Sequence, residues 1–189
     1  MNSALFVTGL WDEGFVIDKY VESSEYIGDD VFGHPQFNTS YTTIGKLLHA
    51  MKYNGHFDTS NEIAEICCDV LKQWLSDIKI DIILPAPPTS ERLSQPVYMI
   101  AESIASKLHI PYSEEVLKKI DSNPAKNMSK NSKSLKGSIV KLKEAKRHCN
   151  ILLIDDFYSS GETANECVSV LKSDPLIEKV YYLAIAKTK

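Results

Sequence analysis

The chain has 189 residues, of which 43% are hydrophobic, and this length and apolar share suit one domain with a single core. Its 21 basic and 25 acidic side chains give a formal net charge of -4, which excludes a broad electrostatic attraction to nucleic acid or anionic lipid. Because the first residues lack the pattern of a secretory signal and no apolar run approaches the roughly 20 residues of a membrane helix, we expect a cytoplasmic location and no membrane partner.

The first elements along the chain are expected to be short strands. Residues 4–8 and 13–21 are rich in β-branched and aromatic side chains, and a hairpin between them is plausible. The Gly, Pro and Asn residues of the stretch 28–40 predict a loop.

Two helices are expected next. Apolar residues recur at helical spacing over 44–51 and again over 63–74, where Ser60 is placed to cap the helix. Strands followed by helices make residues 1–78 an N-terminal α+β extension.

The second half of the sequence alternates between strands and helices. Its strands are nearly all apolar, as strands buried on both faces of a parallel sheet are. The expected elements are strands over 80–84, 150–154 and 179–186, and helices over 95–108 and 163–172. Such alternation predicts a parallel α/β architecture, with residues 79–189 as a ligand-binding core in the same domain.

The stretch 151–163 carries the clearest functional pattern. Four apolar residues lead directly into Asp155 and Asp156, and a hydroxyl-rich turn and the start of a helix follow. A buried strand delivers such acids to the carboxyl edge of a parallel sheet, where they can accept hydrogen bonds from a sugar diol. The turn offers hydroxyl groups and backbone N–H groups at a helix start, which suits a phosphate group. Its residues are Ser159, Ser160, Gly161, Glu162 and Thr163.

The stretch 151–163 also allows two other interpretations. The acids could be a solvated loop entry, with Ser159 and Thr163 only capping a helix, but the ordered succession of strand, acids, glycine turn and helix favours a ligand site. A response-regulator receiver domain also begins with an apolar strand and two acids. Too few residues follow Asp156 to build that domain.

The stretch 151–163 resembles the phosphoribosyl pyrophosphate (PRPP) signature of type I phosphoribosyltransferases, and every position fits. The resemblance implies the type I phosphoribosyltransferase fold. It also implies that Asp155 and Asp156 bind the ribose hydroxyls and take part in catalysis, while the turn from Ser159 to Thr163 binds the 5-phosphate. Mg²⁺ is then expected to be held mainly through PRPP oxygens, with the two acids contributing indirectly.

Weaker likenesses point to the ComF branch of that family. They cover residues 44–55, 81–88, 99–108 and 135–137. They imply that the residues from Pro85 to Arg92 form the pyrophosphate loop. In this loop Ala86, Pro87 and Pro88 would contact pyrophosphate and the Arg92 side chain would meet the leaving group. The residues after Arg92 depart from the Arg-Gly-Phe-Asn-Gln run of ComF proteins, which leaves the acceptor chemistry open.

The resemblance predicts an enzyme that transfers ribose 5-phosphate from PRPP to an unidentified acceptor and releases pyrophosphate. A non-catalytic PRPP or nucleotide sensor, or an accessory role that consumes nucleotides, stays open, as does a homodimer or another protein partner. The Ser-, Asn- and Lys-rich stretch 122–138 fits either a solvated linker or a lid over pyrophosphate.

Overall fold

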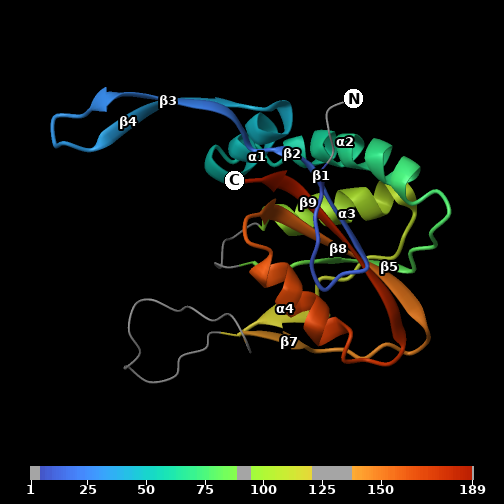
Figure 1. The fold of residues 1–189 in the computed structure, drawn as a ribbon. Coiled ribbons are helices and arrows are strands. Elements are labelled where there is room, and N and C mark those ends of the chain that lie inside the picture. The colour runs from blue at the N-terminus through green and yellow to red at the C-terminus, as the bar shows by residue number, and fades with distance from the viewer. Residues whose placement is uncertain (1–4, 89–94, 121–137, 189) are drawn as a thin grey trace, which may run out of the picture.

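The central feature of the computed structural model, which describes residues 5–88, 95–120 and 138–188, is a mostly parallel sheet (Figure 1). The strand order is β1-β2-β9-β8-β5, and β1 alone runs antiparallel to its neighbour. The strands are β1 (Leu5–Phe6), β2 (Glu13–Lys19), β5 (Ile82–Pro85), β8 (Cys149–Tyr158) and β9 (Ile177–Lys187). The expected α/β class and the pairing of the first two strands are confirmed. The division of the chain at residue 78 stays a prediction.

Helices cover both faces of this sheet. Three of the described helices, α1 (Thr43–Tyr53), α2 (Thr59–Trp74) and α3 (Pro96–Leu108), pack on one face, and α4 (Glu162–Leu171) packs on the other (Figure 1). Strand β8 shows why its apolar run is continuous. Leu152 and Ile154 join the core on the α1–α3 side, whereas Ile151 and Leu153 join the core on the α4 side.

The prediction of a loop over 28–40 is wrong. This stretch belongs to a hairpin of β3 (Val21–Asp29) and β4 (Pro35–Tyr41), the β3–β4 arm, which extends away from the sheet (Figure 1). The glycine and proline that indicated a loop occupy special positions. Gly28 has a φ of 115° beside a register shift in the ladder, and Pro35 begins a strand, where a missing N–H is tolerated.

Two further boundaries differ from the expectation. Ser60 lies inside the first turn of α2, because that helix begins at Thr59 after Asp58. Strand β8 continues to Tyr158, so the acid pair belongs to the strand, whereas we expected the acids to follow it. The ladder with β9 explains the extension, since Asp155 pairs with Ala184 and Tyr158 pairs with Lys187.

A small antiparallel ladder of β6 (Leu117–Lys119) and β7 (Ile139–Lys141) lies on the α4 side of the sheet and was not predicted. It is fastened to α4 by the Glu166 carboxylate, which accepts hydrogen bonds from the N–H groups of Ser138 and Ile139 at 2.7 and 3.1 Å. Within the described residues, no helix combines the length and apolar composition needed to cross a bilayer.

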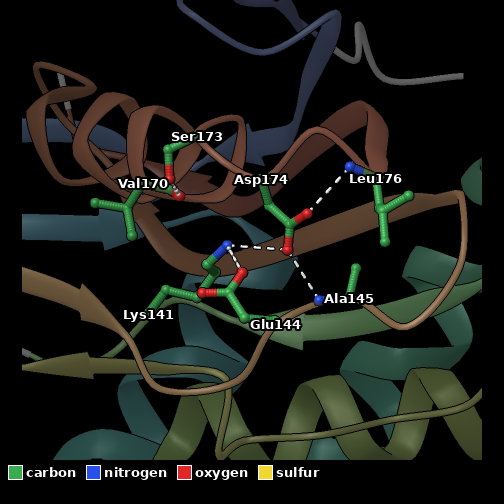
Figure 2. A network of polar contacts seen from close by, with 7 residues as sticks. All are labelled: Lys141, Glu144, Ala145, Val170, Ser173, Asp174 and Leu176. Carbon is green, nitrogen blue, oxygen red and sulfur yellow. Dashed lines mark hydrogen bonds and ion pairs between the residues drawn. The ribbon is translucent and has the colours of Figure 1, made fainter.

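A buried carboxylate holds together the segments near the C-terminal end of α4 (Figure 2). Asp174 is only 4% exposed, and it accepts hydrogen bonds from the N–H groups of Ala145 at 2.9 Å and Leu176 at 3.0 Å. The Lys141 ammonium donates to the same carboxylate at 3.0 Å and also pairs with Glu144. The two backbone bonds and then Lys141 hold the pKa of Asp174 well below its usual range.

Replacing Asp174 with Ala is expected to lower the melting temperature and the urea midpoint, because two backbone donors and a buried ammonium lose their acceptor. A carboxylate with a lowered pKa stabilises the fold above its unfolded-state pKa of about 3.9, and this contribution is lost as the pH falls below that value. The difference between parent and variant should therefore shrink in acid. Glu144→Ala is the matched control, because this exposed carboxylate pairs with the same Lys141 but does not accept the two backbone hydrogen bonds. Equal decreases of the melting temperature and the urea midpoint in the two variants would contradict this account.

Candidate functional site

The carboxyl ends of β5 and β8 lie side by side and open onto a cavity of about 210 Å³. Open α/β sheets place their ligands at this edge. Five separate segments contribute to the cavity, from α1, the end of β5, the start of α3, the end of β8 and the start of α4. The lining residues are Lys52, Ala86, Pro87, Pro88, Gln95, Pro96, Val97, Asp155, Asp156, Phe157 and Thr163.

Asp155 is held in one position by its neighbours. One carboxylate oxygen accepts a hydrogen bond from the Asp156 N–H at 2.9 Å, and the other accepts from the Tyr182 hydroxyl at 3.3 Å. Burial, followed by the adjacent charge of Asp156, raises the pKa of Asp155 to about 7. The surroundings of Asp155 therefore favour its neutral form more than water does.

Asp156 forms an ion pair with Lys52, which the sequence did not single out. The Lys52 ammonium also lies over the Phe157 ring, 4.0 Å from its centroid, and its side chain is only 13% exposed. A lysine in the last turn of an amphipathic helix usually faces solvent. No local signal in the sequence distinguishes this one from a solvated lysine.

The turn after β8 has the backbone geometry expected of an anion cradle. Gly161 has a φ of +76° and directly precedes α4. The Asn165 N–H donates a hydrogen bond to the Gly161 carbonyl, which joins the turn to the first turn of the helix. The N–H groups of the first helical turn have no partner within the helix, and they carry the positive end of its dipole. Thr163 lines the cavity. The other four residues predicted for this turn, Ser159, Ser160, Gly161 and Glu162, are not among the residues that line the cavity. The side chains of Ser159, Ser160 and Glu162 are exposed.

The loop after β5 lies beside the acid pair. The Ala86 N–H donates to the Ile154 carbonyl at 2.7 Å, which ties the end of β5 to the residue before Asp155. Ala86, Pro87 and Pro88 therefore face the same cavity as the acids. Arg92 lies outside the described residues, as does the stretch 122–138 except for its last residue. The roles predicted for Arg92 and for that stretch are untested.

The cavity combines carboxylates that accept hydrogen bonds, a helix start that donates them, and one lysine. Among the described residues, no group of three or more His, Cys, Asp or Glu side chains is placed to hold a metal ion.

No protein-family model matches the sequence, and comparison with curated protein sequences gives no match. Solved structures do match. Adenine phosphoribosyltransferase from Leishmania tarentolae is 11% identical, with a TM-score of 0.52 and coverage of 98% of this chain and 94% of that chain. The Leishmania donovani enzyme is 12% identical, with a TM-score of 0.51 and coverage of 98% and 86%.

The adenine phosphoribosyltransferase from Trypanosoma brucei, solved with AMP, pyrophosphate and ribose-5-phosphate, is 13% identical, with a TM-score of 0.50 and coverage of 98% and 87%. Likeness at such identities concerns the fold. The chain has the type I phosphoribosyltransferase fold, as the resemblance of its signature stretch implied.

Proposed function

We propose that the protein is a phosphoribosyltransferase that binds PRPP in the cavity between β5, β8 and α4. The observation that carries this proposal is the meeting of three chemically different walls in one cavity. The acid pair suits the ribose hydroxyls, the start of α4 suits the 5-phosphate, and the loop of Ala86 to Pro88 suits pyrophosphate. Each wall matches one part of PRPP.

In the proposed reaction the bond between ribose C1 and the pyrophosphate oxygen breaks, and its electron pair leaves with pyrophosphate. The acceptor forms the new bond to C1 and loses a proton. Asp155 and Asp156 hold the ribose and stabilise the positive charge that develops on it. Arg92 would meet the departing pyrophosphate. Mg²⁺ bound to PRPP would neutralise part of the phosphate charge, with Asp155 and Asp156 reaching it indirectly.

The finer features of this assignment rest on the sequence. The likenesses over 44–55 and 81–88 support a place in the ComF-like branch, and the expected compartment is the cytoplasm. The acceptor is unidentified. Its identity distinguishes this protein from others that share the fold, since one fold supports many acceptors.

Titration with PRPP and Mg²⁺ is expected to release heat and to raise the melting temperature. A ligand at about 100 times its Kd stabilises a fold by about 2.7 kcal/mol, which corresponds to roughly 5–10 °C in a domain of this size. Ribose 5-phosphate should bind more weakly, because it lacks the pyrophosphate contacts. Calorimetry without heat and melting curves without a shift, both at millimolar PRPP, would refute the proposal.

Incubation of the protein with labelled PRPP and a set of candidate acceptors separates an enzyme from a sensor. An enzyme releases pyrophosphate with one acceptor or, slowly, with water. Binding without any release in the whole set would instead identify a PRPP sensor.

A further inference from the structure

We propose that Lys52 is a positioning residue that offsets the charge of Asp156 and so allows a polyanionic ligand to bind beside the acid pair. This inference rests on the proposed function. It concerns a residue outside the signature stretch, on helix α1.

Lys52 is held in place by contacts with the end of β8. Lys52 comes from the last turn of α1 and forms its ion pair with the Asp156 carboxylate, which is 21% exposed. Its ammonium also lies over the face of Phe157, which follows Asp156 in β8. A cation near the end of a helix is favoured by the helix dipole, so α1 supports the position of this charge. Lys52 is thus held between two residues of β8.

In the part of the chain that the structure describes, the lining of the cavity carries two acidic side chains and one basic side chain. Two adjacent carboxylates suit ribose hydroxyls, which are neutral donors, but they repel the phosphate groups that the same ligand carries. Among the described residues that line the cavity, Lys52 is the one with a basic side chain. Its charge, paired with Asp156, reduces the negative field that an incoming polyanion meets. A ligand with more negative charge should depend more strongly on Lys52.

The alternative is that the ion pair only fastens α1 to the sheet. In that case, replacing Lys52 would lower the melting temperature of the ligand-free protein and would weaken the binding of all ligands by the same factor. A role in charge compensation has a different signature, because the loss grows with ligand charge and depends on the charge of Asp156. The two roles can therefore be separated by measurement.

The test is calorimetric titration of Lys52→Met, Lys52→Arg and the parent with PRPP and with ribose 5-phosphate, both with Mg²⁺. Lys52→Met should weaken PRPP by about 10-fold or more and ribose 5-phosphate by clearly less, because the loss of the compensating charge is felt most by the ligand with more negative charge. Lys52→Arg should recover most of the affinity, because it keeps the charge. Lys46→Met is the matched control, since Lys46 is an exposed residue of the same helix.

A double-mutant cycle with Asp156→Asn tests the route of the effect. If Lys52 acts by offsetting Asp156, Lys52→Met should cost much less affinity once residue 156 is neutral. Additive losses, or equal losses for PRPP and ribose 5-phosphate, would overturn the inference. So would a Lys52→Met variant that binds PRPP as the parent does. A parent protein that does not bind PRPP would refute the proposed function itself, so the two failures are distinguishable.

Discussion

Replacing Asp155 or Asp156 with Asn is expected to weaken PRPP binding by about 10- to 100-fold in each case while the protein stays folded. A hydrogen bond to a charged group contributes roughly 1.5–3 kcal/mol, and about 1.4 kcal/mol corresponds to a factor of ten in affinity. Both acids line the cavity, and Asp155 already accepts two hydrogen bonds that keep its carboxylate in place. Calorimetry measures the affinity, and the melting temperature without ligand reports the fold.

The matched control for these variants is Asp69→Asn, which neutralises an exposed acid on α2 that does not line this cavity. It should bind PRPP as the parent does. If Asp155→Asn and Asp156→Asn also bind like the parent, the acids are an ordinary strand end and the proposed site is wrong.

The raised pKa of Asp155 adds a pH dependence to the same prediction. The ionised carboxylate is the better acceptor for ribose hydroxyls, and it is lost as the pH falls through about 7. Parent affinity should therefore decrease from about pH 8 to about pH 6. Phosphate groups of the ligand titrate in the same range, with a pKa of about 6. Asp155→Asn serves as the control, because its remaining pH dependence belongs to the ligand.

Replacing Gly161 with Val is expected to reduce the affinity for ribose 5-phosphate by about 100-fold, because a phosphate bound as we propose would accept hydrogen bonds from at least two N–H groups of the turn. Gly161 has a φ of +76°, where a side chain costs roughly 1–2 kcal/mol. Its Cβ would also lie 3.1 Å from a ring carbon of Tyr158 and 3.4 Å from one of Trp11. The strain at this φ, together with the close approach to Tyr158, favours a shift of the turn, and the N–H groups at the start of α4 then lose their alignment.

Gly33→Val separates backbone strain from the loss of the cradle. Gly33 has a similar φ of +79°, but nothing lies within 4 Å of a Cβ built there, and it belongs to the turn of the β3–β4 arm. Melting curves and calorimetry on both variants should show unchanged ribose 5-phosphate binding for Gly33→Val. Unchanged binding by a folded Gly161→Val protein would contradict a phosphate site at this turn.

The central sheet could be predicted from the sequence because its strands are buried on both faces. In the run from Ile151 to Ile154, alternate side chains enter the cores on opposite faces of the sheet. Few other structures accommodate four apolar residues in succession. The turn at Gly161 was also predictable. A glycine between hydroxyl residues and a helical pattern indicates the backbone conformation that the structure shows.

Local patterns were less informative where strands lack a buried face. The β3–β4 arm is largely exposed, with Tyr26 of β3 at 58% and Phe37 of β4 at 55%, so no alternation of buried and exposed side chains distinguished it from a loop. Local patterns also did not reveal that β8 continues to Tyr158. Asp155 and Asp156 belong to the strand because β9 pairs with Asp155 and, beyond the acids, with Phe157 and Tyr158. This pairing partner comes later in the chain.

The sequence by itself determined the parallel α/β class, the acid pair and the glycine turn, since each depends on residues that are neighbours in the chain. Only the tertiary structure decided which distant residues share the cavity with them. Lys52 meets Asp156 because α1 packs on the same sheet to which β8 belongs, and the loop of Ala86 to Pro88 lies nearby because β5 pairs with β8. Such contacts depend on how helices and strands pack, which residue types and their spacing do not specify.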